Sequence, residues 1–389
     1  MAEKRKMLPV WGVVLLDIAL TAAGIGGYML FDYVMPQKLS VKTEVVATVD
    51  SSADTFALPD EKTDSQGEQT DESETESAVS DHDLGVDSKA SNRGTVEPKS
   101  QNGKRNLSNK NTYDVESDKN LFSSINGEEA ESELLGTTRT DNSVVSVYKR
   151  SIGEGDEKIT YFVADVYVSN VSEIKTAFAD DSYGKNIKDS VYNMAVDNNA
   201  IFAINGDYYG NAEESIVIRN GVKYRDSASE TDVLVLFTDG VMRTYLPEEF
   251  DIDAVIAQGA WQAWNFGPAL LDGEGNVLDT FNTTSYLNSK NPRSAVGYVE
   301  PGHYVFVTVD GRDKGYSSGA TLSELAAILS DEGCIYGYNL DGGKSAMMYY
   351  DGEIINEPDG GGRDISVQTD EQSSGVQTNS KKGISQAIV

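Results

Sequence analysis

A long polar stretch, residues 40–141, limits what this chain can fold into more than any other feature. It is rich in Ser, Thr, Asp, Glu, Asn and Gly and has no sustained apolar period. Such a sequence cannot bury enough apolar surface to offset the loss of chain entropy on folding. We therefore predict a disordered acidic linker, spanning on the order of 50–60 Å, that holds a folded domain away from the N-terminus. Binding of cations or of a basic partner by this acidic run is the alternative.

An apolar segment precedes the linker. Residues 7–35 contain no charge except Asp17 before Asp32, and this length is sufficient to cross a bilayer as a helix. The basic residues among 1–6 predict a cytoplasmic N-terminus and an extracellular C-terminal domain on a single-pass cell-membrane protein. A cleavable signal peptide is the alternative, but the small residues that a cleavage site needs lie inside the apolar run.

Charge and cysteine content exclude several classes of function. The net charge is -31, so we expect no nucleic-acid partner, because a phosphate backbone is bound by basic surfaces. The chain has one cysteine, Cys334, and two histidines, which excludes an intramolecular disulfide and a Cys/His zinc site. Any metal would be a hard cation bound by oxygen, and Cys334 is expected to be a buried core residue.

The folded domain is predicted over residues 144–366. Short runs rich in Val, Ile, Tyr and Phe, bounded by Gly, Asn or Asp, predict strands at 144–149, 161–168, 200–205, 233–237, 295–299, 304–309 and 346–350. The dipeptides Asn220-Gly221, Asp239-Gly240 and Asp351-Gly352 lie between apolar runs and are typical of hairpin turns. Antiparallel sheet should therefore dominate.

Two helices complete this pattern. One is expected over residues 186–197, and the other begins after Thr321, which forms a capping box with Glu324, and ends at Gly333. The predicted fold class is α+β: mostly antiparallel sheet with a few helices, in one compact extracytoplasmic domain after a transmembrane helix and a disordered linker. Residues 367–389 are polar and are predicted to be a disordered tail.

Four segments place polar groups and glycines just beyond apolar strands. They are Ile204-Asn-Gly-Asp-Tyr-Tyr209, Asn291-Pro-Arg-Ser-Ala-Val-Gly297, Thr308-Val-Asp-Gly-Arg312 and Tyr338-Asn-Leu-Asp-Gly-Gly-Lys-Ser345. Each alone is compatible with a simple turn or a surface ion pair. Four of them together indicate several strand ends that meet around one pocket.

These segments, with the Gly-Tyr-Ser-Ser-Gly-Ala-Thr-Leu-Ser-Glu-Leu helix entry from Gly315, resemble in order the motifs of the phosphodiester glycosidase family. The resemblance covers residues 200–364. It departs from the family pattern at Lys344, where a third glycine is usual, and after residue 366, where a closing apolar strand is expected. The resemblance implies a hydrolase that cleaves the glycosidic bond of a sugar 1-phosphodiester, with N-acetylglucosamine 1-phosphodiester as the expected type. Bacterial members are often described as exopolysaccharide biosynthesis proteins.

Such a reaction needs carboxylates at the anomeric carbon and guanidinium groups at the departing phosphate. We hypothesise that Asp310 and Asp341 are the catalytic carboxylates, one at the anomeric carbon and the other activating water. The phosphate would be held by Arg293, Arg312, Gly342, Gly343, Lys344 and Ser345. Sugar hydroxyls would be bound by Asn205 and Asp207, with Ca²⁺ at Asp207 as the alternative.

We thus predict a membrane-anchored hydrolase acting on a cell-surface glycan, glycopolymer or exopolysaccharide phosphodiester. Two other classes are kept open: a catalytically inactive carbohydrate- or phosphate-binding surface module, and a structural accessory protein of polysaccharide export. The Asp-Gly-Arg segment 310–312, Asp341 and Arg293 favour the enzyme.

Overall fold

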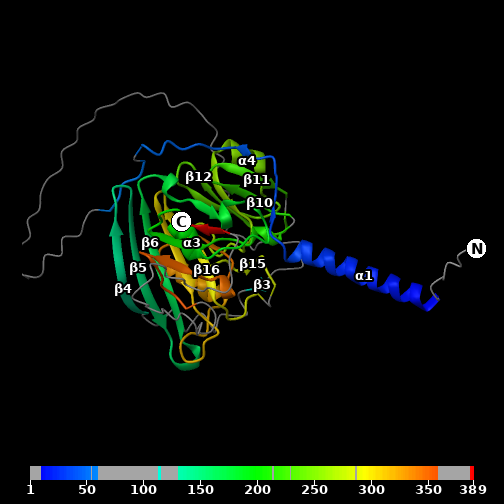
Figure 1. Cartoon of the computed structure of the whole chain (residues 1–389). Coiled ribbons are helices and arrows are strands. Elements are labelled where there is room, and N and C mark those ends of the chain that lie inside the picture. The colour runs from blue at the N-terminus through cyan, green and yellow to red at the C-terminus, as the bar shows by residue number, and fades with distance from the viewer. Residues whose placement is uncertain are drawn as a thin grey trace, which may run out of the picture.

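The computed structural model describes residues 10–53, 55–59, 113–114, 130–212, 214–227, 229–284, 287–357 and 386–389. Most of the predicted linker, and the tail up to residue 385, lie outside these ranges. Figure 1 shows a domain of antiparallel sheets with few helices, as predicted, and one long helix that projects from it. That helix, α1 (Val10–Tyr33), lies within the predicted transmembrane segment and is apolar enough over Val14–Tyr33 to cross a membrane.

The other helices of the described residues are short. They are α3 (Val191–Asp197), α4 (Ile252–Ala257) and α5 (Leu322–Asp331), with the 3₁₀ turns η2 (Gly155–Glu157), η3 (Val171–Glu173), η4 (Ala179–Asp181), η5 (Tyr209–Asn211) and η6 (Gly343–Ser345). The predicted capping box of α5 is confirmed, because Thr321 Oγ1 accepts from Glu324 N at 3.1 Å and Glu324 Oε2 accepts from Thr321 N at 2.7 Å. α3 begins later than predicted, because the side chain of Ser190 caps it there.

Sheet I has the strand order β18-β16-β17-β6-β5-β4. Its strands are β4 (Glu131–Arg139), β5 (Ser143–Ile152), β6 (Ile159–Val168), β16 (Arg293–Glu300), β17 (His303–Val309) and β18 (Tyr336–Asn339), all in antiparallel pairs. β4 begins ahead of the predicted domain boundary at residue 144. It is a polar edge strand, mostly exposed on both faces, so it carries no apolar alternation that a sequence pattern could reveal.

Sheet II has the order β13-β12-β14-β10-β11-β2. Its strands are β2 (Glu44–Val45), β10 (Ile216–Arg219), β11 (Val222–Asp226), β12 (Val233–Phe237), β13 (Met242–Tyr245) and β14 (Ala260–Trp264). The predicted turn at Asn220-Gly221 joins β10 to β11, and both residues have positive φ, 51° and 73°. This conformation is the one that a two-residue hairpin turn requires.

Sheet III has the order β20-β19-β9-β21-β7. Its strands are β7 (Thr176–Phe178), β9 (Phe202–Asn205), β19 (Met348–Tyr350), β20 (Glu353–Ile354) and β21 (Gln386–Ile388). The end of the chain therefore does not belong to a disordered tail, since β21 pairs with both β7 and β9. The closing strand that the sequence seemed to lack after residue 366 is present about twenty residues later, and is too short to stand out from the polar residues before it.

Ile388 supplies a stability test of this closing strand. Its side chain is 1% exposed in the main core, so Ile388→Ala is expected to lower the free energy of unfolding by about 2–5 kcal/mol through lost burial and a residual cavity. Denaturant unfolding of the full chain in detergent measures the change, with Val389→Ala as the partly exposed control. Equal effects from the two variants would contradict the placement of β21.

The core lies between the three sheets. Its main cluster combines Trp264 of sheet II, Phe306 of sheet I, Ile204 of sheet III and Leu325 of α5. On the opposite face of sheet III, α3 covers Ala203, and on the opposite face of sheet II, α4 covers a second apolar layer. Each large sheet therefore buries at least one face, and the polar strand ends remain at the rims.

Residues 32–59 lie along the surface of the domain, which differs from the prediction of a free linker beginning at residue 40. β1 (Gln37–Lys38) pairs with β8 (Gly184–Lys185), and β2 pairs with β11. Further on, the amides of Thr55 and Phe56 both donate to Ser169 O. These contacts satisfy backbone groups on exposed strand edges over two-residue pairings, too short to leave a periodic signal. The remaining small sheet pairs β3 (Tyr113–Asp114) with β15 (Thr280–Phe281).

Candidate active site

The four polar segments meet at one rim of the domain, as predicted. The antiparallel register of sheet I brings the start of β16 beside the end of β17, with Arg293 opposite Val309, and beside the end of β18, with Ala295 opposite Asn339. The remaining segment, residues 204–209, follows β9 of sheet III. Antiparallel pairing places strand starts next to strand ends, so these loops share one rim although they are far apart in the sequence.

Asn205 joins the segments. Its Nδ2 donates to Asp341 O at 2.7 Å, and its Oδ1 accepts from Ser294 Oγ at 2.6 Å and from Met347 N at 3.2 Å. The side chain is 1% exposed. Asn205 therefore uses its hydrogen-bonding groups to fix the loops, and the predicted contact with sugar hydroxyls is not available to it in this arrangement.

Asp341 follows β18 and leads into the glycine turn. Its Oδ1 accepts from Gly342 N at 3.0 Å, and Gly343 N donates to Pro292 O at 2.9 Å. A Cβ at Gly342 would lie 2.6 Å from Pro292 O, so glycine is needed for this close approach. The two amides thus hold the turn together, in contrast to the prediction that they would bind phosphate, while the half-buried carboxylate of Asp341 remains at the rim.

Arg312 lies over this turn. A Cβ built on Gly343 would be 3.5 Å from Arg312 Nη1, so the guanidinium group lies over the open side of this glycine. Arg312 has a φ of 58°, a left-handed conformation that costs an arginine about 1–2 kcal/mol. Its Nη2 donates to Asn291 Oδ1 at 2.7 Å. Unfavourable backbone conformations are concentrated at functional sites, and this one places a positive charge at the rim.

Arg293 is buried beside Arg312 and braces the rim. Its Nη2 donates to Leu287 O at 2.6 Å and to Ser289 O at 2.7 Å, and its Nε donates to Ala320 O at 3.0 Å. Burial, together with the like charge of Arg312, lowers the pKa of Arg293 to about 10. The two guanidinium groups are therefore close enough to repel each other, and a bound anion would relieve that repulsion.

Asp310 lies deeper than predicted for a catalytic carboxylate. It is 0% exposed. Its Oδ1 accepts from Asn356 Nδ2 at 2.8 Å, and its Oδ2 accepts from Tyr316 OH and from Glu357 N, both at 2.9 Å. These donors separate Asp310 from the rim, so its position is that of a residue that orders the loop carrying Arg312.

The environment of Asp310 predicts a pH-dependent stability. Burial raises the pKa of Asp310 above its ordinary value of 3.8, and the hydrogen bonds from Glu357, Asn356 and Tyr316 offset this only in part. Protonated Asp310 therefore contributes to the free energy of unfolding at pH values below its ordinary pKa. This contribution is lost as the pH rises through the raised pKa of Asp310 in the folded protein. We expect Asp310→Asn to gain stability relative to wild type as the pH rises from about 4 to about 7. Denaturant unfolding over this range measures it, and a difference that does not vary with pH would contradict it.

Asp207 forms a buried ion pair instead of a ligand site. Both of its carboxylate oxygens accept from Arg219 Nη2, at 3.0 and 2.9 Å, and the two side chains are 1% and 0% exposed. Since a guanidinium group occupies the oxygens that Ca²⁺ would need, Asp207 does not fit the predicted cation or sugar contact. Among the described residues, no group of three or more His, Cys, Asp or Glu could hold a metal ion.

Two further predicted residues lie in η6. Lys344 is exposed at the rim next to Gly343, whereas Ser345 is 2% exposed. Cys334 is buried as predicted, and burial raises the pKa of its thiol, which disfavours the thiolate. It packs against Gly297 of β16, four residues along the strand from Arg293.

Several residues that shape the rim could not be singled out from the sequence. Asn291 orients Arg312, Tyr316 and Asn356 bind Asp310, and Arg219 neutralises Asp207. Asn291 lies inside one of the four segments, so the sequence indicated its place at the rim but not its hydrogen bond to Arg312. Arg219 ends an apolar strand with no neighbouring acid in the sequence, and only the fold brings Asp207 to it.

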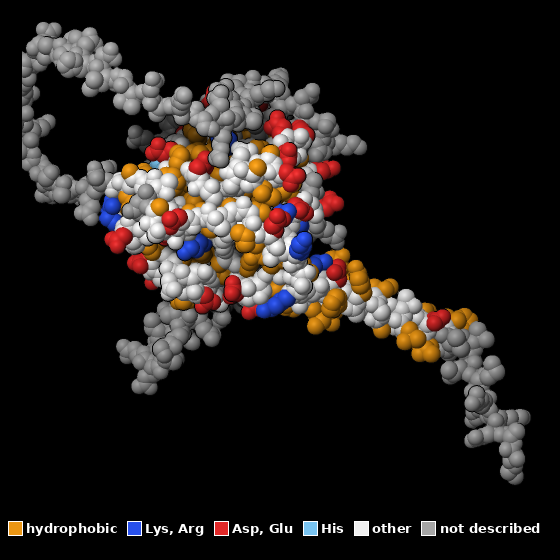
Figure 2. Space-filling view, turned by 90° about the horizontal axis from the view of Figure 1, so that it is seen from above, with side chains coloured by type: hydrophobic (Ala, Val, Ile, Leu, Met, Phe, Trp, Pro, Cys, Tyr) orange, Lys and Arg blue, Asp and Glu red, His pale blue; other side chains and the backbone are white. Residues whose placement is uncertain are grey.

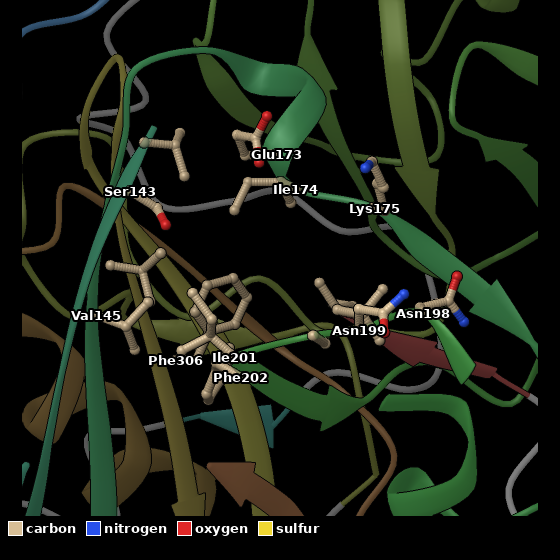
Figure 3. Close-up of a pocket in the computed structure, with 15 residues that line it drawn as sticks. Ser143, Val145, Glu173, Ile174, Lys175, Asn198, Asn199, Ile201, Phe202 and Phe306 are labelled. Carbon is tan, nitrogen blue, oxygen red and sulfur yellow. The ribbon is translucent and has the colours of Figure 1, made fainter. Parts of the chain in front are cut away.

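A separate cavity of about 130 Å³ lies between sheets I and III. Figure 3 shows Val145, Phe202 and Phe306 lining it, with Lys175 and Asn198 further along its wall. None of its lining residues belongs to the four segments. It is therefore distinct from the rim where Asp341 and Arg312 lie.

Parts of this chain are similar to known proteins. Residues 198–369 match the family model described as phosphodiester glycosidase. The SPbeta prophage-derived uncharacterized protein YomE of Bacillus subtilis (strain 168) is 31% identical over 247 residues, which are 58% of this chain, and the chain spans only 38% of that relative's length.

Two solved structures are similar at low identity. The zebrafish N-acetylglucosamine-1-phosphodiester alpha-N-acetylglucosaminidase catalytic domain has 16% identity and a TM-score of 0.47, over 67% of this chain and 87% of that one. A hypothetical protein from Synechocystis has 14% identity and a TM-score of 0.40, over 68% and 64%. The match to the phosphodiester glycosidase family model covers all four rim segments, so the similarity to this family includes the whole candidate site.

Proposed function

We propose that this chain is a membrane-anchored extracytoplasmic hydrolase that cleaves the bond between C1 of a sugar and the phosphate oxygen of a sugar 1-phosphodiester. The observation that carries the proposal is the juxtaposition of Asp341 and Arg312 at the Gly342-Gly343 turn. A carboxylate and a guanidinium group at the same glycine turn match the two charges that this reaction develops, positive at C1 and negative on the departing phosphate.

The reaction can be written with the residues at the rim. The bond between C1 and the phosphate oxygen breaks, its electron pair leaves with the phosphodiester oxygen, and a water oxygen bonds to C1. In this proposal Asp341 stabilises the positive charge at C1 and accepts the proton of the attacking water. Asp310 acts through its hydrogen bonds to Tyr316 and Glu357 as a positioning residue.

The arginines support an anionic leaving group. Arg312 is held over the turn in a costly backbone conformation, and its positive charge adds to the effect of burial in lowering the pKa of Arg293. Exposed Lys344, where the family usually has glycine, adds a third positive charge next to Gly343. A phosphate group at this rim would therefore be bound by charge rather than by the amides of the turn.

Replacement of Arg312 by lysine tests this role. Lysine keeps the charge but loses the planar pair of donors that contacts Asn291, so Arg312→Lys is expected to lower kcat/KM by about 100-fold. The assay measures release of N-acetylglucosamine from an N-acetylglucosamine 1-phosphodiester by the full chain in detergent. Lys314→Ala is the matched control, because the Lys314 side chain is 84% exposed. Equal rates for Arg312→Lys and the control would count against the phosphate role.

The same assay separates the hydrolase from the two other functions considered. Saturable binding of the phosphodiester by the wild type without any turnover is the result for a surface-binding module. Neither binding nor turnover is the result for a structural accessory of polysaccharide export. We place the N-terminus in the cytoplasm on the basis of the basic residues among 1–6, with the domain and its glycan or glycopolymer substrate outside.

A further inference from the structure

The end of α1 is fixed to the folded domain. Lys185 Nζ lies 3.0 Å from Asp32 Oδ1, and Asn186 Nδ2 donates to Asp32 O at 2.9 Å and to Met35 O at 3.3 Å. Leu39 N then donates to Tyr183 O at 3.1 Å. The ion pair is only one quarter exposed on each side, so solvent screens it less than a surface pair.

The chain between the end of α1 and the domain is short. β1 pairs with β8 through Gln37 opposite Lys185 and Lys38 opposite Gly184. A Cβ at Gly184 would lie 2.2 Å from Gln37 O, so the two strands are in tight contact. From Tyr33, where α1 ends, to Gln37 the chain reaches at most about 14 Å. β8 is therefore within that distance of the point where a membrane-spanning helix would emerge.

The exposed side chains at this end of α1 suit a membrane interface. Tyr28 and Tyr33 are 63% and 67% exposed, and Figure 2 shows apolar side chains along the helix where it projects from the domain. Tyrosines are enriched at the headgroup level of a bilayer. Lys185 lies 5.6 Å from the centroid of the Tyr33 ring, which links the domain directly to this interface residue.

The chain reaches the domain before the acidic stretch begins. After β1, the chain pairs with β11 through β2 and passes Ser169, and Pro59 O accepts from Arg139 Nη2 at the end of β4. The described chain resumes at β3, which pairs with β15, and again at Ala130, at the start of β4. The described residues on either side of the acidic stretch all contact the domain, so the length of that stretch does not set the distance from α1 to the domain.

We propose that contacts of residues 32–39 with β8 hold the domain on the lipid headgroup surface, and that its substrate is a sugar phosphodiester carried by the membrane. The substrate class rests on the proposed hydrolase function. A domain of about 230 residues has a diameter of roughly 45 Å, so a docked active site reaches only bonds within that height of the bilayer.

The rim is connected to this docked side. Gly184 N donates to Tyr209 OH at 3.3 Å, and the Tyr183 and Tyr209 rings stack with centroids 5.1 Å apart. Tyr209 is four residues beyond Asn205, which binds Asp341. Figure 1 shows α1 leaving the domain on the side where β15 and β3 lie. The loop after β15 contains Leu287, whose carbonyl oxygen accepts a hydrogen bond from Arg293. Direct contacts therefore connect the anchored strand β8 to the loop that follows Asn205.

The distance from the domain to the membrane tests the docking. The full chain with Lys188→Cys is labelled with a fluorophore and placed in nanodiscs, and energy transfer to an acceptor on the lipid headgroups gives the distance from the label to the membrane surface. Native Cys334 stays unlabelled because it is buried. We expect a label within about 20 Å of the surface, unchanged when residues 62–108 are deleted. The double variant Lys185→Ala/Asn186→Ala should move the label outward, whereas Lys158→Ala, on the partly buried turn before β6, should not. If deletion of residues 62–108 shortened the distance from the label to the membrane, the docking proposal would be wrong and the acidic stretch would act as a tether.

Turnover distinguishes failure of the docking from failure of the proposed function. Wild type should hydrolyse a lipid-linked N-acetylglucosamine 1-phosphodiester in the same nanodisc at least tenfold faster than a water-soluble one at equal concentration, and Lys185→Ala/Asn186→Ala should remove that preference while keeping activity on the soluble substrate. Equal rates on both substrates by wild type would overturn the membrane-borne substrate class. No turnover of either substrate overturns the proposed function, while the measured distance still decides the docking.

Discussion

Asp341→Asn is expected to lower kcat for sugar release by about a thousandfold, because the amide keeps the hydrogen bond from Gly342 N but can neither accept a proton from water nor stabilise positive charge at C1. The substrate should still bind, since Arg312 and Arg293 are unchanged, so KM should vary by less than about tenfold. Steady-state kinetics on an N-acetylglucosamine 1-phosphodiester measure both constants.

Asp351→Asn is the control for this prediction. Asp351 lies in the hairpin between β19 and β20 with a φ of 45°, a conformation that asparagine adopts readily. It removes the same charge without touching the rim. If Asp341→Asn retained the kcat of the control, Asp341 would have no part in the chemistry and the carboxylate would have to be sought elsewhere at the rim.

Asp207→Ala is expected to destabilise the fold by about 3–5 kcal/mol, because it leaves the guanidinium group of Arg219 buried without its counter-charge. Arg219 is 1% exposed and also donates to Ile218 O at 2.9 Å, so it cannot turn to solvent without breaking β10. Denaturant unfolding of the full chain in detergent measures the loss.

The double variant Asp207→Ala/Arg219→Ala separates the ion pair from simple loss of packing. Its loss of stability should be smaller than the sum of the losses of the two single variants, because neither charge remains unpaired. A role of Asp207 in sugar or cation binding predicts the opposite pattern: an increased KM with an unchanged free energy of unfolding.

The sequence predicted the strands that carry periodic apolar residues and the turns that require positive φ. β5, β6, β12, β16 and β17 all lie where apolar runs placed them, and the capping box at Thr321 marked the start of α5. β4 and β21 were missed for a different reason. β4 is mostly exposed on both faces and β21 has only three residues, so tertiary pairing rather than propensity determines them.

For the candidate site, the sequence predicted which segments meet but not the role of each residue. The presence of polar groups after four strands was enough to predict that their ends meet, because antiparallel neighbours bring starts and ends together. The roles within the site were not readable, since Asp207, Asp310 and Asp341 look alike in sequence and differ in what surrounds them. Arg219 pairs with the first, Tyr316 and Asn356 enclose the second, and only Asp341 remains at the rim.

The position of the bond that breaks is the most direct measure of the central claim. Hydrolysis in ¹⁸O-labelled water by the full chain, followed by mass spectrometry of both products, shows which atom the water attacks. Attack at C1 places ¹⁸O in the released sugar and none in the phosphate, as the proposed glycosidase reaction requires. Label in the phosphate instead would show cleavage of the phosphorus–oxygen bond and would contradict the account.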